Sequence, residues 1–184
     1  RLSLRRRPLG TLRREAPVTD PGLQLRPLDS RHLDATLRWV NDPAMMRLLG
    51  RRARVEPAEH RRWFEGLGQR TDCRYFAVET AGGTHVGNVW LWDIDLSDRK
   101  AEVRVLFGDD SGRNRGYGSA AIDAVSRVAF DELGLRRVYA YVFTTNPRAK
   151  RAFDKAGFRE EGLLRHDRVV DGEPVDVWVL ARLA

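Results

Sequence analysis

Cysteine and long hydrophobic runs are scarce in this sequence. Cys73 is the only cysteine among 184 residues, which excludes an intrachain disulfide and favours a reducing compartment. No apolar run approaches the roughly 20 residues of a membrane-spanning helix, and no apolar core typical of a signal peptide is present. The four histidines, His32, His60, His85 and His166, are too scattered to indicate a metal site. We therefore expect a cytoplasmic protein with no metal and no membrane partner.

Positive charge is unevenly distributed. The formal net charge is +7, and residues 1–22 contribute much of it, with six arginines against Glu15 and Asp20. That segment shows no sustained periodicity, so we expect a basic flexible arm at 1–22 and one domain at 23–184. Such a charge run is more often solvated than bound to nucleic acid, so no nucleic-acid partner is expected. The 42% hydrophobic content suffices for one sizeable core.

Hydrophobic periodicity predicts alternating strands and helices. A period of two predicts strands at 23–28, 75–79, 86–92 and 100–107, with a closing hairpin about Asp171-Gly172. Helical spacing and capping residues predict helices after Asp29, Glu56, Gly118 and Asn146, the first of which stops near 41–43. Residues 137–143 are apolar on both faces, which is typical of a central strand covered on each side.

Paired glycines connect a strand to a helix within residues 105–122. Gly116 and Gly118 let the backbone approach a ligand closely, and the first-turn N–H groups of the following helix have no intrahelical partner. Arg113 and Arg115 add positive charge at the same place. The stretch predicts a site for a phosphate or diphosphate, with an ordinary glycine-rich turn as the alternative.

Two motifs resemble those of the GNAT N-acetyltransferase superfamily. Arg113-x-x-Gly116-x-Gly118 resembles its acetyl-CoA loop, and residues 146–162 resemble its Asn-x-x-Ala…Gly-Phe-x-x-x-Gly segment. The resemblance spans 23–183 and points to the branch of ribosomal-protein alanine, spermidine and amino-sugar acetyltransferases. It implies an α/β (α+β) GNAT fold, a mixed sheet of about six to seven strands flanked by about four helices.

The resemblance implies acetyl-CoA as co-substrate. The pantetheine arm would add to the strand that ends at 105–107, where it splays from the strand at 139–143. Lys150 and Arg151 would meet the 3′-phosphate, although exposed helix charges are the alternative. The implied cofactor contacts are Val105, Leu106, Phe107, Arg113, Asn114, Arg115, Gly116, Tyr117, Gly118, Ser119, Asn146, Lys150 and Phe153.

Glu102 is the expected catalytic base, since an alkylammonium must lose a proton before it can attack a thioester. The alternative for Glu102 is a structural ion pair with Arg104, two residues along the same strand face. Asp93 is the second candidate base. Phe153 occupies the position where many relatives have a tyrosine, so the group that protonates the leaving thiolate is not identified. Cys73 has no adjacent histidine that would indicate a covalent intermediate.

Trp39, Trp90, Trp92 and Asp93 are the expected acceptor-side residues, although large aromatics on a sheet are more often core. His166 is a weaker candidate. The sequence predicts transfer of an acetyl group to a primary amine by direct attack in a ternary complex. A nucleotide-linked amino sugar or another small-molecule amine is favoured over a protein N-terminal α-amine. The alternative is a non-catalytic CoA-sensing or nucleic-acid-binding module. The resemblance also implies a possible homodimer, which is common among relatives.

Overall fold

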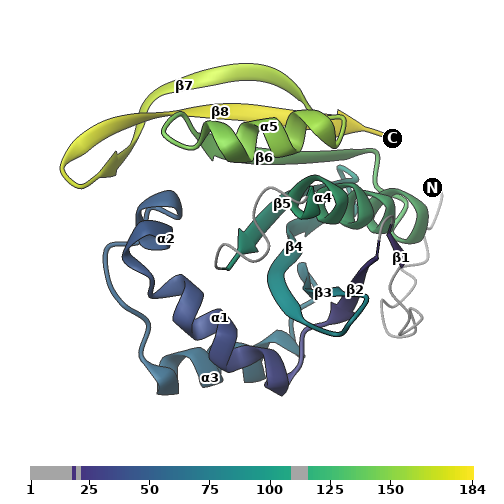
Figure 1. Ribbon diagram of the computed structural model, residues 1–184. Coiled ribbons are helices and arrows are strands. Elements are labelled where there is room, and N and C mark those ends of the chain that lie inside the picture. The colour runs from purple at the N-terminus through teal and green to yellow at the C-terminus, as the bar shows by residue number, and fades with distance from the viewer. Residues whose placement is uncertain (1–17, 20–21, 109–115) are drawn as a thin grey trace.

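The computed structural model describes residues 18–19, 22–108 and 116–184. Within these residues, eight strands form one sheet in the order β1-β2-β3-β4-β5-β6-β8-β7 (Figure 1). Every neighbouring pair is antiparallel except β5 and β6, which run parallel. The strands are β1 (Val18–Thr19), β2 (Leu23–Pro27), β3 (Cys73–Thr80), β4 (His85–Asp95), β5 (Lys100–Phe107), β6 (Arg137–Phe143), β7 (Arg159–Val170) and β8 (Glu173–Leu183).

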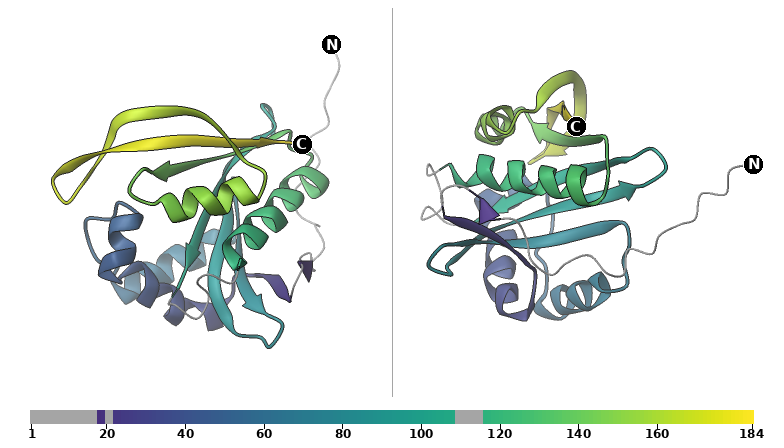
Figure 2. Two further views of the ribbon diagram at one scale, coloured as in Figure 1. Left: turned by 45° about the horizontal axis from the view of Figure 1, so that its top comes forward. Right: turned by 90° about the vertical axis from the view of Figure 1, so that its right-hand side faces the viewer.

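Within the described part of the chain, five α-helices accompany the sheet. They are α1 (Leu33–Val40), α2 (Pro43–Leu48), α3 (Pro57–Leu67), α4 (Tyr117–Arg127) and α5 (Pro147–Lys155). Helices α1 to α3 gather in one region of the molecule, whereas α4 and α5 follow β5 and β6 and lie apart from that group (Figure 1). Figure 2 shows α5 alongside β6 and β8.

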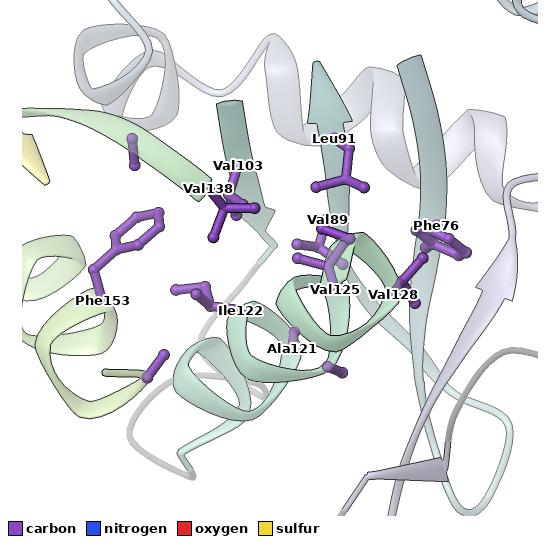
Figure 3. Packing of buried hydrophobic residues seen from close by; sticks show 14 of the residues in the cluster. Phe76, Val89, Leu91, Val103, Ala121, Ile122, Val125, Val128, Val138 and Phe153 are labelled. Atoms are coloured by element: carbon purple, nitrogen blue, oxygen red, sulfur yellow. The ribbon is translucent and has the colours of Figure 1, made fainter. Parts of the chain in front are cut away.

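The main hydrophobic core lies between α4 and the sheet. Ile122 and Val125 of α4 are fully buried and belong to one cluster with Val89, Leu91 and Val103 of β4 and β5 (Figure 3). Burying such side chains contributes about 1.5–3 kcal/mol each relative to leaving them exposed. The opposite face of β5 carries Leu106, which packs with Trp39 of α1 and Met45 of α2 in a second cluster. The two clusters place α4 and the α1–α2 pair on opposite faces of β5.

The predicted fold class is confirmed, with two additions. The two-residue strand β1 lengthens the sheet beyond the six to seven strands expected. Helix α2 was missed because the residues before Pro43 suggested only a stop. Asp42 instead caps a new helix by accepting a hydrogen bond from the Met45 N–H at 2.9 Å, and Pro43 occupies its first position.

Other local predictions are confirmed. The Asn146 side chain caps α5 by accepting from the Ala149 N–H at 3.1 Å, and Gly157 follows α5 with a φ of 87°. Asp171 and Gly172, with φ values of 52° and 87°, form the tight turn between β7 and β8.

The prediction that β6 is covered on both faces is wrong. Val138, Ala140 and Val142 are buried in the main core, but Tyr141, on the other face, is 46% exposed. The apolar residues on both faces of 137–143 predicted a covered strand, but the same pattern also occurs in a strand that borders an open cleft. Among the described helices, none is long and apolar enough to cross a membrane.

The core predicts a large difference between two leucine truncations. Leu91→Ala removes a fully buried side chain and should lower the free energy of unfolding by about 2–5 kcal/mol. Leu96→Ala, at a position that is 50% exposed, should change it by less than about 0.5 kcal/mol. Urea unfolding followed by circular dichroism measures both, and equal losses would contradict the described packing.

Candidate active site

Strands β5 and β6 separate soon after they pair. Their parallel pairing covers only three residue pairs, from Lys100 with Arg137 to Glu102 with Tyr139. Beyond that point β5 stays paired with β4 as far as Phe107, and β6 stays paired with β8 as far as Phe143. Within the described chain, the facing backbone edges therefore have no strand partner. The predicted splay is confirmed, and it leaves main-chain donors and acceptors for water or a ligand.

Gly87 allows the free end of β5 to lie close against β4. Gly87 pairs with Phe107, and a Cβ at Gly87 would lie 2.6 Å from the Leu106 carbonyl oxygen. No side chain fits at that distance, so glycine is required for this close strand contact. The end of β5 is thus fixed from one side while its other edge stays open.

A cavity of about 1010 Å³ lies at this opening. The ends of β5 and β6 and the first turns of α4 and α5 contribute to its walls, together with residues of α2, α3, β3 and β4. Most of the expected cofactor contacts line it, whereas Arg113, Asn114 and Arg115 lie outside the described residues. The predicted residues in the lining are Val105, Leu106, Phe107, Gly116, Tyr117, Gly118, Ser119, Asn146 and Phe153.

The start of α4 suits an anion. Gly116 precedes the helix with a φ of 77° and a ψ of 0°, and no side chain within the described residues caps the first-turn N–H groups. In this left-handed conformation a residue other than glycine costs roughly 1–2 kcal/mol. An added Cβ at Gly118 would lie 3.5 Å from the Cβ of Ala152, so the two helices approach closely here. The helix N-terminus therefore offers uncapped donors and a positive dipole end to the cavity.

Basic side chains of α5 face the same cavity, but not all as expected. Arg148, Arg151 and Lys155, spaced three and four residues apart, line it from one side of the helix. Lys150 does not line it. The Lys150 ammonium lies 3.4 Å from carboxylates of Asp154 and Glu160 instead.

The side of the cavity where we expect the acceptor is built from cross-strand neighbours. Tyr75, Trp90 and Arg104 lie opposite one another on β3, β4 and β5, and Trp92 lies opposite Glu102. Glu102 and Arg104 share the β5 face of Leu106, opposite the α4 core. These five residues all line the cavity, so the structure brings Trp90, Trp92 and Glu102 together as expected.

Glu102 makes the predicted ion pair while also lining the cavity. Arg104 donates from Nε to Glu102 Oε1 at 2.8 Å and from Nη2 to Oε2 at 2.7 Å. The Glu102 side chain is 10% exposed, so this bidentate pair holds a nearly buried carboxylate in one orientation. The Arg104 guanidinium also lies 5.1 Å from the centroid of the Trp92 ring.

Several expected residues lie outside this cavity. Trp39 is buried and packs on His85, with ring centroids 4.6 Å apart. Asp93 lies where the β4–β5 pairing is irregular and accepts a long hydrogen bond of 3.4 Å from the Tyr139 hydroxyl. Burial, and next the Asp93 charge, raise the pKa of Tyr139 to about 12. His166 is exposed on β7 and its backbone N–H donates to Asp176.

Cys73 is not poised as a nucleophile. The residue is buried, and burial raises the pKa of its thiol, which disfavours the reactive thiolate at neutral pH. This environment disfavours a covalent intermediate on Cys73, in line with the absence of an adjacent histidine.

Sequence reasoning missed the aromatic wall above the sheet. His60 and Trp63 of α3 stack with centroids 5.0 Å apart, and Trp63 meets Tyr75 edge-on at 5.3 Å. Tyr75 in turn stacks on Trp90 at 5.1 Å. Helical spacing relates His60 to Trp63, but only the β3–β4 register places Tyr75 beside Trp90.

Residues 23–159 match the family model of the acetyltransferase (GNAT) domain, which covers more than half of the chain. The chain belongs to the GNAT acetyltransferase family. This match confirms the family expected from the two sequence motifs, and it favours an acetyltransferase over the non-catalytic module.

Named relatives are similar over different shares of the chain. The spermidine N(1)-acetyltransferase of Vibrio cholerae is 30% identical over 104 residues, which are 56% of this chain and 60% of that protein. The chain thus aligns with less than two thirds of that relative. The putative phosphinothricin acetyltransferase YwnH of Bacillus subtilis is 28% identical over 168 residues, 87% of this chain and 98% of that protein. The L-amino acid N-acetyltransferase AaaT of Escherichia coli is 29% identical over 130 residues, 69% of this chain and 78% of that protein.

Solved structures show the same fold. The crystal structure of the Vibrio cholerae spermidine N-acetyltransferase in complex with CoA and spermine superimposes with a TM-score of 0.83. It covers 89% of this chain and 96% of that chain at 24% identity, so the likeness concerns the fold alone.

The α5 geometry predicts different effects for two neighbouring cations. Arg151→Ala should weaken coenzyme A binding about tenfold, since a hydrogen bond to a charged group is lost. Lys150→Ala, whose ammonium is engaged by two carboxylates, should leave the affinity within about twofold.

Isothermal titration calorimetry with coenzyme A and with its 3′-dephospho form measures both variants. If Arg151 meets the 3′-phosphate, its substitution has no effect on the dephospho form. Equal weakening by the two substitutions would contradict the assigned lining.

Proposed function

We propose that the protein transfers the acetyl group of acetyl-CoA to the primary amine of a small molecule, by direct attack in a ternary complex. The observation that carries this proposal is one cavity with two kinds of wall. One wall has open strand edges, a helix N-terminus and cations suited to the cofactor. The other has an oriented carboxylate and aromatic rings suited to an amine acceptor.

The open edge of β5 would bind the pantetheine arm by main-chain hydrogen bonds. Val105, Leu106 and Phe107 lie on this unpaired stretch, which can accept an amide-like chain as an added strand. One of its N–H groups would also polarise the thioester carbonyl, and one such donor is worth about 10²-fold or more in rate. The diphosphate would lie at the first turn of α4, beside Gly116 and Gly118.

Glu102 would accept the proton of the attacking amine, directly or through a water molecule. Arg104 orients the carboxylate but engages each oxygen once, and each carboxylate oxygen has a second lone pair. Asp93 is less well placed for this role, since it does not line the cavity.

The leaving thiolate would depart without help from Phe153. The Phe153 side chain is 3% exposed, packs in the main core and carries no hydroxyl. A thiol has a pKa near 8.5, so its conjugate base is a tolerable leaving group. Tyr117 and Tyr141 line the cavity and would supply hydroxyl groups for its protonation.

A small-molecule acceptor, for example a nucleotide-linked amino sugar, is favoured over a protein N-terminus. The stacked rings of Tyr75 and Trp90 offer flat surfaces for a sugar or base. The named relatives act on different amines, spermidine and L-amino acids among them, so relatedness alone does not select the acceptor. The single cysteine supports a cytoplasmic location.

Exchange of Glu102 tests the proposed base. Glu102→Gln keeps a partner for Arg104 but cannot take a proton, so turnover at pH 7 should fall on the order of 10². Turnover should recover partly at alkaline pH as free amine accumulates, while the affinity for coenzyme A stays unchanged.

Glu161→Gln is the matched control. Glu161 also forms a bidentate pair with an arginine, Arg137, but lies outside the cavity lining. Its substitution should leave turnover unchanged. Full activity of Glu102→Gln in the thiol-release assay would assign the base elsewhere.

We also propose self-association of the chain through β7. This strand forms one edge of the sheet, and its apolar Leu163, Leu164 and Val169 are 39–48% exposed. A dodecameric structure is known for the Vibrio cholerae spermidine N-acetyltransferase.

Charge on β7 should disrupt that association. Leu164→Arg should lower the mass seen by light scattering toward 21.0 kDa, the mass of one chain, whereas Leu96→Arg at a similarly exposed turn should not. A monomeric parent protein would refute the interface.

A further inference from the structure

The acceptor end of the cavity contains two polar atoms without a partner. Within the described residues, His60 Nε2 and Trp90 Nε1 are buried and make no hydrogen bond. His60 is only 6% exposed, and both residues line the cavity. Leaving such a group unpaired costs about 1–3 kcal/mol, so these atoms indicate where a polar group of a ligand would lie.

The nature of the two atoms constrains that group. The indole N–H of Trp90 can only donate, so it needs an oxygen or another acceptor from the ligand. Burial, and next the charge of Arg51, lower the pKa of His60, so its imidazole is neutral at pH 7. A neutral imidazole carries no charge that would favour an anion or a cation. Its Nε2 atom can donate or accept one hydrogen bond, depending on the tautomer.

Most of the charged residues that line this end are already paired. Arg51, Arg104 and Arg168 line the cavity with Glu59 and Glu102, but Arg168 is held by Asp167 at 2.7 Å. Arg104 uses two of its N–H groups on Glu102, which offsets the negative charge of that carboxylate while leaving each oxygen a second lone pair. Arg51 has no ion-pair partner among the described residues, so its guanidinium is available to a ligand.

A polycationic amine fits this lining poorly. Spermidine carries three positive charges at neutral pH, and it would find one uncommitted carboxylate, Glu59, together with the unpaired guanidinium of Arg51. Like charges raise the free energy of binding, and low local dielectric inside a cavity strengthens the repulsion. An amine that also carries a negative group would instead be attracted to the Arg51 guanidinium through that group.

We infer that the acceptor is an amine that bears a carboxylate or phosphate, with Arg51 and the Trp90 N–H binding the anionic group. This inference rests on the proposed acetyl transfer and narrows its acceptor class. Amino-sugar phosphates, nucleotide-linked amino sugars and amino acids share the required chemistry. Polyamines lack it, although relatives are named for them.

Matched acceptor pairs test the inference. The purified protein is assayed for acetyl-CoA-dependent thiol release with glucosamine 6-phosphate against glucosamine, L-phenylalanine against its amide, a nucleotide-linked amino sugar, and spermidine. The expected result is a kcat/KM at least tenfold higher for the anionic members than for the neutral members or spermidine. Equal or higher values for glucosamine, the amide or spermidine would overturn the inference but leave acetyl transfer standing.

A different result would overturn the proposed function itself. If coenzyme A binds and none of these amines is acetylated, both the transfer reaction and the acceptor class fall together. The two failures are thus distinguishable in one assay.

Two arginine variants localise the effect. Arg51→Gln should lower kcat/KM for the anionic member of a pair about tenfold and leave the neutral member within twofold. Arg52→Gln is the control, since Arg52 is exposed and does not line the cavity. Equal losses for both members of a pair in Arg51→Gln would show that Arg51 does not recognise the anion.

Trp90→Phe tests the N–H without removing the ring. The substitution should lower kcat/KM for the anionic member of a pair, so the ratio of kcat/KM between the anionic and the neutral member becomes smaller. The phenylalanine ring should still stack on Tyr75. An unchanged ratio would remove Trp90 from the anion site.

Discussion

The early separation of β5 from β6 is the constraint on which the rest of the site depends. After three residue pairs the two strands follow different neighbours, β5 along β4 and β6 along β8. The unpaired edges would be unfavourable in a closed core, because backbone groups without partners cost free energy. Here they border a cavity instead, and the fold supplies helix termini and cations around it. A chain with its own amide groups, such as pantetheine, is the complement of such an edge.

The two faces of β5 carry different chemistry. Val103 faces α4 in the main core, whereas Glu102, Arg104 and Leu106 face the side of α1 and α2. Strand alternation therefore places a core residue, Val103, and the carboxylate that we propose as the base, Glu102, next to each other in sequence but on opposite sides of the sheet. Access between the two sides exists where the sheet splits. The ion pair between Arg47 of α2 and Asp171, at 2.8 Å, links α2 to the β7–β8 hairpin.

Much of the fold could be predicted from local patterns. Caps such as Asn146 and the turn at Asp171-Gly172 have short-range chemical causes, and the structure confirms them. Helix α2 was missed although Asp42-Pro43 carries the chemistry of a helix start, because the same residues also stop a helix. The exposed face of β6 at Tyr141 was mistaken for core, since periodicity does not reveal which elements cover a strand.

The parts of the site that come from a single helix or loop could be predicted from the sequence. Residues of the α4 and α5 first turns line the cavity as expected, whereas the lysine at 150 points to two carboxylates of its own neighbourhood. The wall of His60, Trp63 and Tyr75 was not predictable, because it depends on strand register and on how α3 packs above the sheet. Contacts between segments distant in sequence build this wall of the cavity, and no local pattern predicts them.

Hydrogen–deuterium exchange with and without coenzyme A tests the central claim most directly. Binding of the cofactor along the open edge should slow exchange of the backbone amides in residues 103–107, while amides of β3, already paired on both sides, should not change. Slower exchange confined to the α4 start, with 103–107 unaffected at saturating coenzyme A, would contradict the role assigned to the separated strands.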